Sequence, residues 1–131
     1  MGFCCGHNNC INQSPNSESA RYKNTYLYDA INMYESFKFV VAFENSDYEG
    51  YITEKLILPF LAGAVPIYLG PVDASKYFNP KAYINCRDHI SLEACIDYVY
   101  YVNDNFTLYL EILSEQPITG KKFNDFFYPN L

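Results

Sequence analysis

Two short apolar runs without polar interruption, Phe39–Phe43 and Val65–Leu69, restrict the possible folds of this chain most strongly. A strand with one face in water alternates apolar and polar residues, whereas a strand covered on both faces, as in a parallel sheet, is apolar throughout. Residues 51–61, between the two runs, carry apolar side chains at helical spacing, and Gly63 is suited to end such a helix. Strand, helix and strand in this order predict an α/β layered domain with a parallel sheet.

Further segments continue the alternation of helices and strands. Their periodicity predicts a helix before the first run, a turn or helix after the second, a third strand and two final helices, at residues 29–37, 74–78, 82–85, 92–102 and 106–113. Ser91 is suited to cap the helix that follows it, and Pro59 should kink or shorten the helix at 51–61. Residues 7–25 and the tail to Leu131 show no periodicity, so we expect irregular structure there.

The charge of the chain restricts its possible partners. Fifteen acidic and nine basic residues give a formal net charge of -6. We therefore expect no nucleic-acid partner, because such a chain cannot present the broad basic surface that nucleic acid requires. A small anionic ligand remains compatible, since one or two placed cations and a helix N-terminus suffice for it. No run of about 18 consecutive apolar residues occurs, so no segment is predicted to span a membrane.

Five cysteines raise the questions of metal binding and of disulfide formation: Cys4, Cys5, Cys10, Cys86 and Cys95. The first three lie near His7, as thiolate and imidazole ligands of zinc often do, but no second paired-ligand half follows, and we expect no metal. A free buried thiol and one disulfide in an oxidising compartment are the remaining interpretations. Two glycosylation sequons, at Asn12 and Asn105, are compatible with such a compartment.

Residues 43–56 contain the pattern with the clearest chemistry. They place Glu44 and Asn45 at the end of a buried strand, and Thr53, Glu54 and Lys55 at the start of the next helix. Ligands of open α/β sheets bind at the carboxyl ends of the strands. Free helix-start amides and a lysine favour a diphosphate, and carboxylates accept hydrogen bonds from sugar hydroxyls. The pattern predicts a nucleotide-sugar site, although it also fits a capped helix start with a Glu54–Lys55 pair facing water.

Three ordered motifs, FENSDYEGYITEKL, LAGAVPIYLGP and YFNPKAYIN, resemble the signature run of the family 10 alpha-1,3/4-fucosyltransferases, and the likeness extends from about Phe37 to about Leu113. The resemblance implies a Rossmann-like parallel sheet within the C-terminal, GDP-fucose-binding domain of a GT-B glycosyltransferase. Residues 26–131 would form that domain after an irregular segment at 1–25. The resemblance further implies inverting transfer of fucose from GDP-fucose to a GlcNAc or Glc hydroxyl of a glycan acceptor, in protein or lipid glycosylation.

The family's donor-binding residues map onto positions of this sequence. Lys55 is expected to contact the phosphates, Asn45 and Glu54 to bind ribose or fucose hydroxyls, and Tyr51 and Thr53 to shape the nucleotide pocket. The sequence requires no cofactor, and GDP-fucose is expected as the donor substrate. The general base is expected in an N-terminal acceptor domain that these residues do not include, so no catalytic residue is predicted within this chain.

The chain departs from the family pattern in one cationic position. The family's diphosphate-binding arginine lies upstream of the FEN motif, where Arg21 and Lys23 are weak substitutes. Glu44 is expected to orient Asn45 or its loop, or to pair with a helix. Without an acceptor half, we expect a chain that is inactive alone. The alternatives are a non-catalytic remnant that binds nucleotide sugars and, more distantly, an unrelated flavodoxin-like binding module.

The expected localisation follows from the resemblance. Eukaryotic members are Golgi membrane proteins that face the lumen and are held by an anchor that these residues do not contain, whereas bacterial members are cytoplasmic. The sequons and the cysteines favour the Golgi apparatus. Neither the acceptor glycan nor its linkage follows from these residues.

Overall fold

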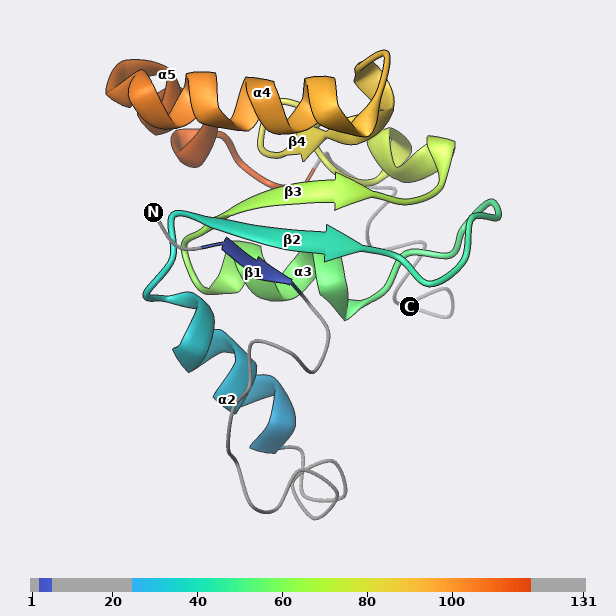
Figure 1. Cartoon of the computed structure of the whole chain (residues 1–131). Coiled ribbons are helices and arrows are strands. Elements are labelled where there is room, and N and C mark those ends of the chain that lie inside the picture. The colour runs from blue at the N-terminus through green and yellow to red at the C-terminus, as the bar shows by residue number, and fades with distance from the viewer. Residues whose placement is uncertain (1–2, 6–24, 119–131) are drawn as a thin grey trace.

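The computed structural model describes residues 3–5 and 25–118 of the chain, which form an α/β domain around a parallel sheet. Its strands lie in the order β1 (Phe3–Cys5), β2 (Phe39–Phe43), β3 (Val65–Leu69) and β4 (Ile84–Asn85). All three neighbouring pairs are parallel, and Phe39 of β2 pairs with Val65 of β3. The carboxyl ends of the strands therefore meet at one edge, to which the arrowheads point in Figure 1. Both strands predicted from the apolar runs are confirmed to the residue, and so is the parallel α/β class.

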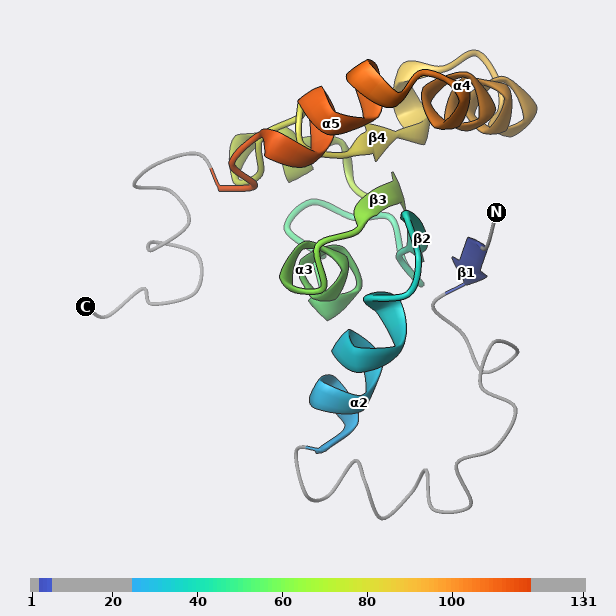
Figure 2. The ribbon, with the colours of Figure 1, turned by 90° about the vertical axis from the view of Figure 1, so that its left-hand side faces the viewer.

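Helices accompany these strands on both sides of the sheet. In the described part of the chain they are α2 (Thr25–Tyr34), α3 (Glu54–Leu61), the 3₁₀ helices η1 (Val72–Lys76) and η2 (Cys86–Asp88), α4 (Leu92–Asp104) and α5 (Phe106–Ser114). Figures 1 and 2 show α2 and α3 on one side of the sheet and α4 and α5 on the other. The sheet thus forms the middle of three layers.

Side chains of β2 explain why its sequence is apolar throughout. Phe39 faces α4 and α5, where it packs with Val99 and Tyr109. Val40 and Ala42 face the opposite layer, which contains α2 and α3. The side chains on both faces of such a strand are covered by helices and removed from water. An alternating pattern would therefore place polar groups in the core.

The helix predicted at 51–61 begins later than expected, at Glu54. Thr53 keeps an extended backbone, with φ -112° and ψ -179°, because its side chain caps the helix instead of joining it. α3 has eight residues and contains Pro59 at a buried position. Gly63 follows the helix end with φ +73°, the left-handed conformation for which glycine was predicted there.

β1 is a strand that the sequence analysis did not predict. Phe3 pairs with Phe39 and Cys5 with Val41, although residues 1–25 were expected to be irregular. The cause is non-local, since a three-residue strand has no periodicity and is recognised by its partner strand. Residues 6–24, with the predicted loop, His7 and Cys10, lie outside the described residues, as do residues 119–131. The division into a segment at 1–25 and a domain at 26–131 stays a prediction.

Other differences concern the ends of elements. α2 begins at Thr25 and not at residue 29, and the third predicted strand, 82–85, is reduced to the two residues of β4. The segment 74–78 is the 3₁₀ helix η1, which starts two residues earlier at Val72. Ser91 caps α4 as predicted, and its hydroxyl accepts a hydrogen bond of 3.1 Å from the amide of Ala94.

Two buried tyrosines predict how stability depends on pH. Burial, with the charge of Asp88 adding to it, raises the pKa of Tyr83 to about 12, and burial beside Glu44 raises the pKa of Tyr68 further. Below pH about 10 both phenols are neutral in the folded and in the unfolded chain, so the full contribution of the two buried tyrosines to the free energy of unfolding is present there. Above that pH the unfolded chain loses tyrosine protons that the folded chain keeps, and the free energy of unfolding should fall as the pH rises from about 10 to 12. Denaturant titrations followed by circular dichroism measure it.

A conservative variant tests the same prediction. The Tyr83 hydroxyl is buried and has no hydrogen-bond partner among the described residues. Tyr83→Phe should therefore leave the free energy of unfolding at pH 8 unchanged or higher, by up to about 1 kcal/mol, and should make the decline above pH 10 shallower. Tyr28→Phe, at a position that is 71% exposed, is the control and should change neither. A variant Tyr83→Phe with the wild-type pH dependence would contradict the prediction.

Candidate functional site

The loop that connects β2 to α3 is held by one carboxylate at the end of β2. Glu44 accepts a hydrogen bond of 2.9 Å from the amide of Thr53 and one of 2.6 Å from its hydroxyl. The hydroxyl of Tyr68, on the neighbouring strand β3, donates to the same carboxylate at 3.3 Å. Glu44 therefore pairs with the start of α3 and closes the loop, which is the helix-pairing alternative of the sequence analysis.

Close approach of these groups depends on Gly70, the residue after β3. A Cβ atom at this position would lie 2.3 Å from the Tyr68 hydroxyl and 2.8 Å from Cγ of Glu44. Burial, followed by the charge of Glu44 and the hydrogen bond to it, raises the pKa of Tyr68, so its phenol stays a neutral donor. The position after β3 therefore has to lack a side chain.

The first turn of α3 holds the predicted phosphate-binding residue. Thr53 caps this helix, and its hydroxyl accepts from the amide of Lys55 at 3.3 Å. The Lys55 side chain is half-buried, and its ammonium has no ion-pair or hydrogen-bond partner within residues 25–118. Glu54 is exposed and forms no ion pair with it. The capped helix start of the alternative interpretation is therefore present, but its Glu54–Lys55 pair is not.

Asn45 and Tyr51, the other predicted donor-binding residues, lie in the same loop. Asn45 is exposed at the end of β2, and Tyr51 is half-buried with its ring 4.8 Å from that of Tyr48. The structure thus brings Glu44 and Thr53 into direct contact and places the other predicted residues beside them along the chain. Their roles toward a ligand stay predictions.

A buried aspartate after β3, which the sequence analysis did not single out, also holds this loop. Both oxygens of Asp73 lie within 3.2 Å of the Gly50 amide nitrogen, and Asp73 is 3% exposed. Nearby, Lys76 of η1 forms an exposed ion pair of 2.9 Å with Glu49, which raises the pKa of Lys76. Asp73 follows a predicted strand at the carboxyl edge of the sheet, and this position is the signal in the sequence by which it could have been found.

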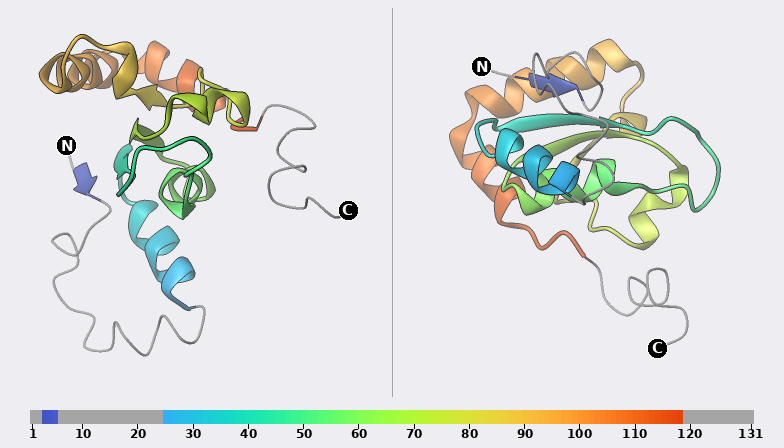
Figure 3. Two further views of the ribbon diagram at one scale, coloured as in Figure 1. Left: turned by 90° about the vertical axis from the view of Figure 1, so that its right-hand side faces the viewer. Right: turned by 90° about the horizontal axis from the view of Figure 1, so that it is seen from below.

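Arg87, in the turn after β4, is a second residue that the sequence analysis missed. Its Nε donates to the carbonyl oxygen of Gly70, and its terminal nitrogen forms an ion pair with Asp47 of the β2–α3 loop. Loops that follow three successive strands are therefore joined through one guanidinium. Figure 1 shows the β2–α3 loop extending beyond the arrowheads, and the right panel of Figure 3 shows it beside the segment that follows β3.

The turn that carries Arg87 is closed by a disulfide between Cys86 and Cys95, whose Cα atoms lie 5.2 Å apart. Of the interpretations left open for these cysteines, the structure thus selects the disulfide. Within residues 3–5 and 25–118, no group of three or more His, Cys, Asp or Glu side chains is placed to hold a metal ion. The metal hypothesis concerned Cys4, Cys5, His7 and Cys10, of which His7 and Cys10 lie outside the described residues.

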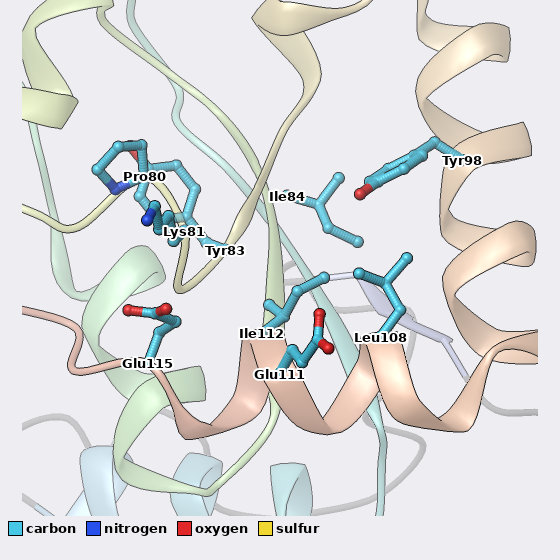
Figure 4. A pocket seen from close by; sticks show the side chains of 9 residues that line it. All are labelled: Pro80, Lys81, Tyr83, Ile84, Tyr98, Leu108, Glu111, Ile112 and Glu115. Carbon is cyan, nitrogen blue, oxygen red and sulfur yellow. The ribbon is translucent and has the colours of Figure 1, made fainter.

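A pocket of about 370 Å³ lies on the side of the sheet that α4 and α5 cover, between α5 and the segment that precedes β4 (Figure 4). Its walls combine aliphatic side chains with two tyrosines, one lysine and two glutamates, and the lining residues are Pro80, Lys81, Tyr83, Ile84, Tyr98, Leu108, Glu111, Ile112 and Glu115. None of the predicted donor-binding residues lines it. Because ligands of parallel sheets bind at the carboxyl ends of the strands, we assign the candidate site to the loop after β2 and not to this pocket.

Sheet topology and loop geometry together define an open α/β domain, a class whose ligands bind at the carboxyl ends of the strands. The comparisons with known proteins are more specific. Residues 6–115 match the profile of the C-terminal part of glycosyltransferase family 10, the fucosyltransferases, and the chain belongs to this family. The family predicted from the three motifs is confirmed.

Individual relatives agree with this assignment. The chain is 36% identical over 112 residues to the alpha-(1,3)-fucosyltransferase FucT of Helicobacter pylori. These aligned residues cover 83% of the chain and 23% of that protein. It is 41% identical over 75 residues to the human 4-galactosyl-N-acetylglucosaminide 3-alpha-L-fucosyltransferase 9, which covers 56% of the chain and 21% of that protein. The chain spans less than a quarter of the length of these curated relatives.

Solved structures extend the similarity to the fold. A crystal structure of an alpha1,3-fucosyltransferase superposes with a TM-score of 0.70 at 26% identity, over 92% of this chain and 40% of that one. A crystal structure of an alpha1,3-fucosyltransferase with GDP-fucose gives a TM-score of 0.66 at 28% identity, over 91% of this chain and 39% of that one. The sheet is therefore that of the C-terminal domain of a GT-B fucosyltransferase. Within the described residues no helix has the length and apolarity to cross a membrane.

Proposed function

We propose that the β2–α3 loop and the start of α3 bind GDP-fucose as the donor in a fucosyl transfer. The observation that carries this proposal is Lys55, whose ammonium has no protein partner among the described residues and lies in the first turn of a helix at the ligand-binding edge. An unpaired cation at such a place is suited to a diphosphate. The superposition on a fucosyltransferase crystallised with GDP-fucose supports the same ligand.

The helix start contributes less to anion binding than its position alone suggests. The amide of Lys55 donates to the Thr53 hydroxyl and that of Leu56 to the Thr53 carbonyl at 3.3 Å, so the cap satisfies two of the helix-start donors. The amide of Glu54 remains available to a ligand, together with the positive end of the helix dipole. We therefore assign most of the attraction for the diphosphate to the Lys55 ammonium.

Sugar recognition falls to the neighbouring polar groups. The Glu54 carboxylate is exposed beside Lys55 and accepts hydrogen bonds, as ribose or fucose hydroxyls require. Asn45, exposed at the end of β2, offers both a donor and an acceptor. The rings of Tyr48 and Tyr51 provide apolar surface for the nucleotide at the same loop. Thr53 acts through the cap, which fixes where the helix begins.

Transfer itself needs an acceptor hydroxyl and a base, and we propose that both come from a second domain that faces this one. The hydroxyl of a GlcNAc or Glc unit gives its proton to that base, its oxygen bonds to the anomeric carbon, and GDP leaves from the opposite side with the electron pair. One displacement of this kind inverts the anomeric configuration. Negative charge grows on the diphosphate as it leaves, and Lys55 is placed to stabilise it. No metal or other cofactor is part of this proposal.

The location of the protein is a further proposal. A disulfide such as Cys86–Cys95 is typical of proteins in oxidising compartments. It supports the Golgi lumen over the cytoplasm, in protein or lipid glycosylation and with a membrane anchor outside these residues. A labelled protein that stays in the cytoplasm of a eukaryotic source cell would contradict this.

Nuclear magnetic resonance tests the proposed donor site directly. On titration with GDP-fucose we expect the largest shifts of amide resonances in residues 44–55, smaller ones near Gly70 and Asp73, and none around the pocket in Figure 4. GDP should give the same pattern, while UDP-GlcNAc should bind at least tenfold more weakly if the loop recognises the guanine nucleotide. Shifts confined to the α5 pocket would overturn the assignment. A full-length protein that binds the donor but contains no acceptor domain would favour the non-catalytic remnant.

A further inference from the structure

Arg87 connects three segments that leave the sheet at its carboxyl edge. It lies in η2 directly after β4, its Nε donates to the carbonyl oxygen of Gly70 after β3, and its terminal nitrogen pairs with Asp47 in the loop after β2. The Arg87 side chain is 30% exposed and that of Asp47 62% exposed. A guanidinium is suited to such a junction because its donors point in fixed directions and reach two acceptors at once.

The turn that presents Arg87 is itself fixed from both sides. Cys86, the residue before Arg87, is 5% exposed and is bonded to Cys95, a fully buried residue in the first turns of α4. Asn85 caps the same turn, and its side-chain oxygen accepts from the Arg87 amide at 3.1 Å. Arg87 therefore extends from a tethered base toward a loop that has few buried apolar contacts of its own.

We propose that Arg87 is a positioning residue that holds the β2–α3 loop against the ends of β3 and β4, and that the Cys86–Cys95 disulfide holds Arg87 in place. Asp47 lies two residues after Asn45, and Gly70 is the position that lies against Glu44 and Tyr68. We call the contacts of Arg87 with Asp47 and with the carbonyl oxygen of Gly70 the Arg87 clasp. The clasp lies on both sides of the Glu44 contacts that close the loop. Its consequence for ligand binding rests on the proposed donor site, whereas its effect on the order of the loop does not.

A second ion pair on the same loop provides a matched control. Lys76 pairs with Glu49 at 2.9 Å, but its side chain is 51% exposed and that of Glu49 74%. Lys76→Gln and Arg87→Gln each remove one positive charge, and only Arg87→Gln breaks a contact that joins the turns after β2, β3 and β4. A general effect of charge on nucleotide binding would appear in both variants, whereas loss of the clasp would appear only in Arg87→Gln.

Hydrogen–deuterium exchange and GDP titration calorimetry on the 131-residue chain test the proposal. We expect Arg87→Gln to speed amide exchange in residues 44–53 by about tenfold and to weaken GDP binding by about tenfold, which corresponds to about 1.4 kcal/mol. Asp47→Asn, a surface change that keeps the fold, should give a smaller effect of the same kind. The variant that combines Arg87→Gln with Asp47→Asn should bind GDP no more weakly than Arg87→Gln alone, since both changes break the same Arg87–Asp47 ion pair. Arg87→Lys should restore part of the affinity, and Lys76→Gln should stay within twofold of wild type.

The disulfide is tested by the paired change of Cys86 and Cys95 to serine, which avoids any effect of a reducing agent on the other cysteines. It should speed exchange in residues 44–53 as Arg87→Gln does. An unchanged loop in this variant would overturn the role of the disulfide, and an Arg87→Gln variant within twofold of wild type in exchange and affinity would overturn the clasp. A loop that loosens on Arg87→Gln in a chain that binds no GDP would support the clasp and contradict the donor site instead.

Discussion

Replacing Lys55 with alanine is expected to weaken the binding of GDP and GDP-fucose by about tenfold to a hundredfold. The side chain is half-buried at the start of α3 and has no protein partner among the described residues, so none of these residues competes with a diphosphate for it. A hydrogen bond to a charged group contributes about 1.5–3 kcal/mol, and each tenfold of affinity corresponds to about 1.4 kcal/mol. Titration calorimetry on the chain measures the change.

Stability should respond differently to the same substitution. Because Lys55 forms no ion pair with any residue that the structure describes, its loss should alter the free energy of unfolding by no more than about 0.5 kcal/mol. In fucosyl transfer the effect should exceed that on binding, reaching a hundredfold or more in kcat, because the charge on the leaving diphosphate is largest in the transition state. Turnover within about threefold of wild type would remove Lys55 from the phosphate role.

Lys81→Ala is the matched control for this experiment. Lys81 is exposed and lies before β4, at the opposite end of the strand from the proposed site, where it lines the pocket in Figure 4. Both variants remove one positive charge from a chain with net charge -6. If the two weaken GDP binding equally, the effect is one of overall charge and the donor site is not at Lys55.

Sequence patterns predicted the fold where the cause was local or periodic. The runs at β2 and β3 were recognised because both faces of each strand are covered, and Ser91 because a capping hydroxyl lies next to the helix it caps. β1 has only three residues, and its identity as a strand comes from pairing with β2 across a long stretch of chain. No local pattern contains that information.

In the candidate site, too, residues that are neighbours in sequence were predicted, whereas residues that meet only in the folded chain were not. Residues 44–55 were predicted because the sequence places them together, and the motif likeness added their family. Asp73 and Arg87 come from the turns after β3 and β4, and they meet the loop only once the strands are in register. Sequence reasoning placed both turns at one edge of a sheet, but it did not identify which side chains would cross from one turn to the next.

A single methyl group at Gly70 should have the largest effect on the architecture of the site. The added Cβ of Gly70→Ala would lie 2.3 Å from the Tyr68 hydroxyl and 2.8 Å from Cγ of Glu44, distances that require both side chains to move. The Tyr68 ring is almost fully buried and cannot turn into water. We expect a loss of about 2–4 kcal/mol in the free energy of unfolding, from overpacking and from the broken Tyr68–Glu44 hydrogen bond together.

Gly63→Ala is the appropriate comparison, because it adds the same atom without a contact. Among the described residues, no atom beyond its chain neighbours lies within 4 Å of a Cβ at Gly63, and its positive φ is a source of strain worth about 1 kcal/mol. The two variants should also differ in binding: Gly70→Ala displaces Glu44 from Thr53 and so moves the start of α3 with Lys55, whereas Gly63→Ala leaves the loop intact.

A double variant separates the steric effect from a general intolerance of alanine at this turn. Tyr68→Phe removes the atom nearest to the added methyl group, together with the hydrogen bond that the methyl group would break. Tyr68→Phe and Gly70→Ala combined should therefore be less destabilised than the sum of the single variants, by about 1 kcal/mol. Additive losses would show that the Tyr68 hydroxyl is not the main obstacle to the methyl group, and would assign the strain to the ring carbon Cζ of Tyr68 and to Cγ of Glu44, which also lie within 3 Å of the added Cβ.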